Sequence, residues 1–159
     1  MKKFFLTIFL ISALTSNLFA ASSSSGSSTK SNYDQAVKLI KSAKNYEKKG
    51  KLDKATKRYE KAFKLLIKSN KKKPSHPDTL NYLGFTSRKI GNYEVAEKYY
   101  LEGLAIDPNH NGINEYLGEL YVKTNRIEKA KERLEVLKNC NCEEFQELNN
   151  VINSGISKY

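Results

Sequence analysis

Few side chains in this sequence could act as bases or metal ligands at neutral pH, and their positions favour structural roles. His76 and His110 are the two histidines, and each stands one residue before an expected helix, beside Pro77 or Asn111. We therefore expect both to serve as helix caps or loop residues. The sequence has no metal-ligand spacing of histidines and carboxylates, no phosphate-binding glycine loop and no nucleophile elbow. It predicts no catalytic residue, no cofactor and no metal site, and so no enzyme.

The two cysteines, Cys140 and Cys142, are separated by Asn141 alone. Two close thiols in an oxidising compartment usually form a disulfide, and this is the first interpretation. A bridge between them closes a very small ring, which predicts a strained geometry and a relatively high reduction potential. Free or partner-linked thiols are the second interpretation. A redox-active exchange pair is the third, since the neighbouring Glu143 and Glu144 do not provide the setting that lowers a thiol pKa.

Positive charge is concentrated in the first half of the chain. The sequence holds 28 lysines and arginines against 17 aspartates and glutamates, and Lys71, Lys72 and Lys73 form a basic patch. Such a patch could meet an anionic membrane surface, an acidic partner or nucleic acid, but lysine-rich helices are more often solvated faces. Arginines are scarce, which suits a bidentate reader of phosphates or bases poorly. We expect no nucleic-acid partner.

The first residues of the chain have the composition of an export signal followed by a tether. Two lysines precede an apolar run at residues 4–14, and small residues follow near Ala20. This arrangement predicts a signal peptide at residues 1–20, with an uncleaved membrane anchor as the alternative. Residues 21–31 are rich in serine and have no apolar face, which predicts a flexible linker. We expect export to the periplasm, with secretion as the alternative.

A 34-residue repeat organises the rest of the chain. The letters YLG at residues 82–84 recur at residues 116–118. An upstream copy matches at an offset of 41, and its seven extra residues, 70–76, are expected in a loop because insertions between repeats lie there. The three copies run over about 36–69, 77–110 and 111–142.

The repeat resembles that of the tetratricopeptide-repeat (TPR) family, which has Leu-Gly in the first helix of each pair. It also has a small residue in the second helix, here Ala96 or Ala130, and a large residue four positions on, here Tyr100 or Leu134. The resemblance implies an all-α fold: a right-handed superhelical stack of about three helix pairs, with a C-terminal capping helix. We expect one domain, 32–159, with the cap helix at 143–153.

Close packing between paired helices explains these residue types. Gly84 and Gly118 remove side chains from the crossings, while Tyr100 and Leu134 should fill the core between repeats. A left-handed residue should end the first helix of each pair, and glycine or asparagine is available at all three places. The expected helices are 32–48, 52–69, 77–89, 93–106, 111–123, 127–139 and 143–153.

TPR proteins as a family bind partners on the concave face, which the first helices of the pairs line. Carried over position by position, the resemblance predicts a mixed groove with one exposed aromatic, Phe85, basic at one end and acidic at the other. The sequence does not reproduce the lysine and asparagine pattern of the carboxylate-clamp TPRs. The predicted partner-binding residues are Lys41, Lys44, Asn81, Phe85, Arg88, Glu115, Glu119 and Val122.

The end of the chain, Cys-Glu-Glu-Phe-x-x-Leu, also resembles that of a group of exported bacterial TPR proteins whose cysteines stand a few residues further apart. Together these features predict a non-catalytic adaptor or scaffold that binds a partner protein or peptide of unknown identity. The alternative is a structural module that self-associates or lies on an anionic membrane surface through its lysine-rich first repeat.

Overall fold

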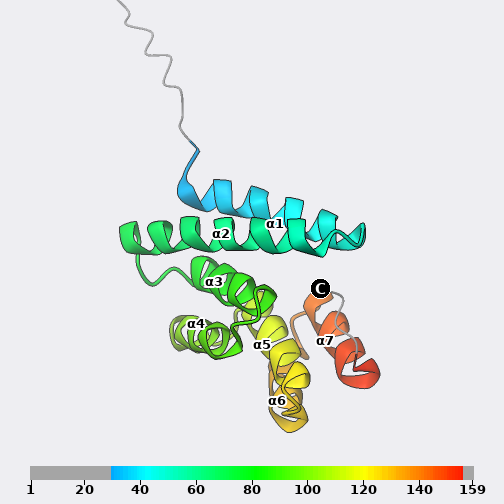
Figure 1. Ribbon diagram of the computed structural model, residues 1–159. Helices are drawn as coiled ribbons and strands as arrows, with labels where there is room; N and C mark the ends of the chain where they lie inside the picture. Colours follow the sequence, from blue (N-terminus) through cyan, green and yellow to red (C-terminus); the bar gives the residue numbers. More distant parts are fainter. Residues whose placement is uncertain (1–29, 156–159) are drawn as a thin grey trace, which may run out of the picture.

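A computed structural model describes residues 30–155, and every regular element in this part of the chain is an α-helix (Figure 1). The expected signal peptide, 1–20, and nearly all of the expected linker lie outside the described residues. Ser31, the last linker residue, caps the first helix, because its side chain accepts a hydrogen bond from the Asp34 N–H. The helices are α1 (Asn32–Lys48), α2 (Leu52–Lys72), α3 (Pro77–Lys89), α4 (Tyr93–Ile106), α5 (Asn111–Lys123), α6 (Ile127–Leu137) and α7 (Glu143–Ser154).

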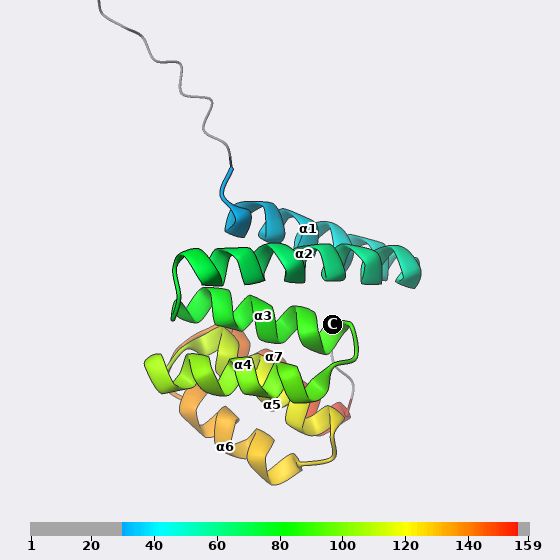
Figure 2. The ribbon, with the colours of Figure 1, turned by 60° about the vertical axis from the view of Figure 1, so that its left-hand side comes forward.

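The helices form three antiparallel pairs that stack in chain order, and Figure 2 shows them layered from α1 to α6. α7 packs against α5 and α6 at the end of the stack. The first helices of the pairs also touch one another, α1 with α3 and α3 with α5. We call these three helices the inner layer. The expected all-α repeat stack with a capping helix is confirmed.

The same hydrogen-bonded turn closes all three pairs. The N–H donors of Lys51, Asn92 and Arg126 each bond the carbonyl five residues earlier, at 2.9, 2.9 and 2.7 Å. Just before each donor stands a left-handed residue: Gly50, Gly91 or Asn125, with φ of 66°, 86° and 58°. This is the Schellman ending of a helix, in which the left-handed residue satisfies the last carbonyls. The expectation for these turns is confirmed.

The insertion between the first two repeats is only partly a loop, which corrects the prediction. Residues 70–72 continue α2, and the loop starts at Lys73. Lysine and asparagine are compatible with a helix, and lysines are favoured in its last turn. The helix ends before Pro74 because a proline disfavours the helical conformation of the residue that precedes it.

Gly84 and Gly118 are both sites of close packing, but their neighbours differ. A Cβ at Gly84 would clash with the ring of Tyr100 on α4, the second helix of the same pair. A Cβ at Gly118 would lie 2.5 Å from a methyl group of Leu148, which belongs to α7. Leu134 is only half-buried, so the prediction that it fills the core like Tyr100 is wrong. The helix that follows the third pair, α7, supplies that side chain.

Replacing Gly84 with alanine should destabilise the fold more than the same change at Gly118. At Gly84 the new methyl group meets the face of a buried ring, whereas at Gly118 it meets the end of a leucine that can rotate. Overpacking costs about 1 to 3 kcal/mol, and exchanging a helical glycine for alanine gains about 1 kcal/mol. Urea unfolding should therefore show a loss of up to about 2 kcal/mol for Gly84→Ala and little change for Gly118→Ala. Equal stability of the two variants would contradict this packing.

Candidate functional site

The inner layer contains all eight predicted partner-binding residues, but the structure buries most of them. Lys41 on α1 is exposed, and Lys44 and Val122 are half-buried. The other five predicted residues are buried, and burial prevents most of them from touching a large partner surface directly. The buried residues are Asn81, Phe85, Arg88, Glu115 and Glu119.

Phe85 was expected as the exposed aromatic of the groove, and this prediction is wrong because its side chain is 0% exposed. Its ring centroid lies 4.9 Å from that of Tyr116 on α5 and 5.7 Å from that of Tyr59 on α2. Lys44 of α1 places its Nζ 4.7 Å from the same centroid, within the range of a cation–π contact. All three repeats therefore meet on this ring, and their side chains close it off from solvent.

A buried ion pair joins the second and third repeats beside this ring. Arg88 Nη1 lies 2.7 Å from Glu119 Oε2, and the two side chains are 6% and 0% exposed. The guanidinium also lies 5.6 Å from the ring centroids of Phe85 and Tyr116. Removing one partner of a buried pair costs about 3 to 5 kcal/mol, since the other charge is left uncompensated. Arg88 and Glu119 thus hold the inner layer together.

Carboxyl groups of α5 and α7 crowd beside the ion pair. Burial raises the pKa of Glu115 well above its usual range, and a hydrogen bond with the Glu147 carboxyl group raises it further. Lys44 faces the same carboxylates from α1, but burial lowers the pKa of its own ammonium group. Its Nζ lies 3.4 Å from the Tyr116 hydroxyl. The inner layer therefore holds a carboxyl group that favours its protonated form.

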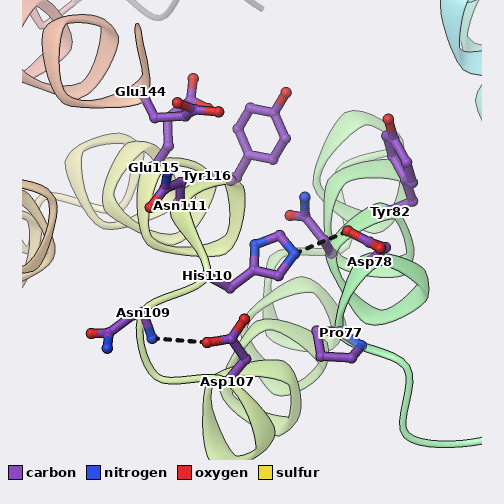
Figure 3. Close-up of a pocket in the computed structure, with 12 residues that line it drawn as sticks. Pro77, Asp78, Tyr82, Asp107, Asn109, His110, Asn111, Glu115, Tyr116 and Glu144 are labelled. Carbon is purple, nitrogen blue, oxygen red and sulfur yellow. Dashed lines mark hydrogen bonds and ion pairs between the residues drawn. The ribbon is translucent and has the colours of Figure 1, made fainter. Parts of the chain in front are cut away.

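A pocket of about 620 Å³ opens where α3 and α5 begin, as Figure 3 shows. Asn81 and Glu115 lie in its wall, and their exposed fractions are 8% and 3%. The Asn81 Oδ1 and the Glu115 Oε1 are buried and have no hydrogen-bond partner among the described residues. Two predicted residues are thus brought together here, with acceptor atoms that a ligand could satisfy.

Other residues of the pocket were not predicted from the sequence. Tyr82 and Tyr116 contribute aromatic rings, and Asp78, Asp107 and Glu144 contribute carboxylates (Figure 3). The two tyrosines stand 34 positions apart, so their recurrence before Leu-Gly could have identified them. Glu144 had no such signal because α7 lies outside the repeats.

His110 stabilises the rim of the pocket, as a capping residue should. Its Nδ1 accepts a hydrogen bond of 3.2 Å from the Ile113 N–H, and its Nε2 lies 3.1 Å from Asp78 Oδ1. A proton on Nε2 fits both contacts. His76 stands at the N-cap of α3 but makes no side-chain capping bond. The prediction of a capping or loop role is confirmed for both histidines, since His110 caps α5 through its side chain and His76 occupies the N-cap position of α3.

A family model described as tetratricopeptide repeat matches residues 34–109, which span the first two helix pairs and end in the loop after α4. Residues 34–109 belong to the tetratricopeptide-repeat family. The third pair lies beyond this match, yet its turn has the same hydrogen bonds as the other two and a left-handed residue at the same place, Asn125 instead of glycine.

Similar proteins include one partial sequence relative and solved structures of similar fold. The uncharacterized protein ycf37 of Guillardia theta is 39% identical over 59 residues, which cover 36% of this chain and 33% of that protein. The chain therefore spans about a third of this curated relative. A structure of SycD, the type III secretion translocator chaperone of Yersinia enterocolitica, has a TM-score of 0.54 at 23% identity. That match covers 76% of this chain and 88% of SycD.

A second SycD structure is similar to the same extent. Its TM-score is 0.53 at 22% identity, and the match covers 77% of this chain and 81% of that chain. At these identities the likeness concerns the arrangement of the TPR helices.

The cysteines and the basic patch lie outside the pocket. Cys140 and Cys142 form a disulfide with their Cα atoms 5.2 Å apart, which confirms the first interpretation. Cys142 is the N-cap of α7, so the bridge lies where the TPR stack passes into its cap. The basic patch, Lys71 to Lys73, is exposed at the end of α2. No helix among residues 30–155 is long and apolar enough to span a membrane, and these residues include no cluster suited to a metal ion.

Replacing Glu115 with glutamine should stabilise the protein at neutral pH. The folded TPR holds the Glu115 proton at pH values where the unfolded chain has released it. The free energy of unfolding of the wild type therefore falls as pH rises above the usual glutamate range, by up to about 1.4 kcal/mol per pH unit from this group. Denaturant titrations should show equal stability of wild type and variant near pH 4, and a more stable variant near pH 7.

The matched control is Glu128→Gln, which removes an exposed carboxylate on α6. Its effect should stay within about 0.5 kcal/mol at either pH. A Glu115→Gln variant that loses stability as the pH rises, relative to wild type, would contradict the assigned protonation.

Proposed function

We propose that this chain is a non-catalytic adaptor that holds a segment of a partner protein in the pocket where α3 and α5 begin. TPR domains are protein–protein interaction modules, and the fold supports that general role. The observation that carries the specific proposal is the pocket itself, because two buried acceptor atoms in its wall have no partner among the described residues. A polypeptide segment brings the N–H donors that such atoms need.

The structure changes which residues we assign to partner binding. Asn81 and Glu115 stay, and Tyr82 joins them because it is half-buried and lines the pocket. Phe85, Arg88 and Glu119 serve the core instead. Lys41, Lys44 and Val122 remain predicted contacts at the edges of the inner layer.

Export remains part of the proposal. It rests on the composition of residues 1–20, which favours a signal peptide and a periplasmic location, with secretion as the alternative. The serine-rich stretch that follows would give the folded domain reach. The Cys140–Cys142 disulfide is compatible with an oxidising compartment.

A second candidate function uses the basic patch. Lys71 to Lys73 are exposed together at the end of a helix, and they stand apart from the pocket. In this case the module self-associates or binds an anionic membrane surface through the patch. The adaptor is the preferred proposal because the cavity beside Lys72 and Lys73, of about 370 Å³, is smaller than the pocket, of about 620 Å³.

Site-specific crosslinking in the cells that produce the protein separates these functions. A photoreactive phenylalanine replaces Tyr82 in the pocket, Lys72 in the basic patch, or Glu128 on the outer face, one position at a time. The adaptor proposal expects one stoichiometric partner protein from position 82 and none from position 128. Crosslinks to a second copy of the chain or to lipid from position 72, with none from position 82, would favour the second function. The same products from all three positions would contradict both.

A further inference from the structure

The pocket is acidic within a strongly basic protein. The whole sequence carries a formal net charge of +11. The pocket nevertheless has Asp78, Asp107, Glu115 and Glu144 among its lining residues, and none of the described residues that line it is a lysine or an arginine. His110 is the one basic side chain there, and it is engaged with Asp78. A cation entering this pocket therefore meets carboxylates and no resident side-chain cation in the wall.

Unpartnered acceptors point to the same kind of ligand by an independent route. Asn81 Oδ1 and Glu115 Oε1 come from α3 and α5, and both side chains are more than nine-tenths buried. An acceptor that is buried without a donor is costly, so a group that brings several N–H donors would relieve both atoms together. The guanidinium of arginine carries five donors in one plane and matches carboxylate geometry.

The rings of the pocket suit the same group. Tyr82 and Tyr116 line the space beside the acceptors. Guanidinium groups stack favourably on the faces of aromatic rings, and two resident cations, Arg88 and Lys44, already lie 5.6 and 5.7 Å from the centroid of the Tyr116 ring. The volume of about 620 Å³ accommodates a long side chain together with part of the backbone that carries it.

We propose that this pocket recognises an arginine side chain of the partner segment, with its guanidinium between Asn81 and Glu115. The inference rests on the proposed function, because the arginine belongs to the segment that the adaptor holds. A carboxylate clamp binds a negatively charged group, whereas this pocket would bind a positively charged one. The buried Glu115 then has a ligand-binding role.

Binding should be coupled to proton release. The carboxyl group of Glu115 faces Glu119 on its own helix, Glu144 and Glu147 on α7, and Lys44 on α1. Burial and, after it, the three carboxylates raise the pKa of Glu115 and favour its protonated form, so an incoming guanidinium must displace that proton to form a charged pair. The affinity for arginine should therefore rise with pH between about 6 and 8, by up to tenfold per pH unit.

The test is a titration of the ¹⁵N-labelled protein with capped peptides, followed by NMR. The probes are acetyl-Gly-Arg-Gly-amide, the same peptide with citrulline in place of arginine, and free arginine. We expect the arginine peptide to shift the amide signals of residues 78–82 and 110–116, and to bind at least ten times more tightly than the citrulline peptide. Equal affinity of the two peptides would overturn the proposal. Tighter binding of free arginine than of the capped peptide would overturn its assignment to a partner segment.

Variants locate the interaction in the pocket. Several are used so that a folding defect in one of them is not mistaken for a loss of binding. Glu115→Gln should lower the affinity for the arginine peptide at least tenfold and abolish its pH dependence. Asp78→Asn, at an exposed position, should lower the affinity by a smaller factor, and the matched control Glu128→Gln should leave it unchanged. Unchanged affinity in Glu115→Gln would contradict the assigned site.

The two proposals fail in different ways. If position 82 still crosslinks a partner while the arginine and citrulline peptides bind alike, the arginine pocket is wrong and the adaptor stands. If position 82 captures no partner, the adaptor itself is wrong.

Discussion

The meeting of three helices on the ring of Phe85 is the contact on which the inner face of this protein depends. α1 contributes Lys44, α3 contributes the ring and Arg88, and α5 contributes Tyr116. A helix pair of a repeat protein buries its apolar face only against its neighbours, so the stack closes around its largest shared side chains. Closure fills the middle of the inner layer and leaves open space where α3 and α5 begin. The position of the candidate site therefore follows from the packing of the core.

The helices and their turns could be predicted from the sequence because the signals that end each helix are local. A left-handed glycine or asparagine sets each turn without help from distant residues. The exposure of side chains in the inner layer depends instead on how closely α1 approaches α5, as at the contact between Lys44 and Tyr116. No local sequence pattern predicts the distance between these two helices. The repeat spacing likewise pointed to Leu134 as the residue that fills the core of the third repeat. Leu148 of α7 packs against Gly118 instead, and the 34-residue spacing does not extend to this helix.

The members of the site were easier to predict than their arrangement. Asn81 and Glu115 stand 34 positions apart, so the repeat places them on equivalent faces of two helices, and the fold brings both to one pocket. Glu144 could not be foreseen, since it comes from the cap. Charge in this chain lies in two regions. The lysines of α1 and α2 form a positive region, and the carboxylates of the pocket form a negative one. Such a separation orients a charged partner before contact and so favours one mode of docking.

Hydrogen–deuterium exchange of the protein, alone and with the partner captured through position 82, tests most directly whether the pocket is the binding site. Amides that a bound segment covers exchange more slowly. The account predicts added protection at residues 77–82 and 109–116, with none on the exposed face of α6. Protection confined to the end of α2 or to α6, with the pocket segments unchanged, would contradict it.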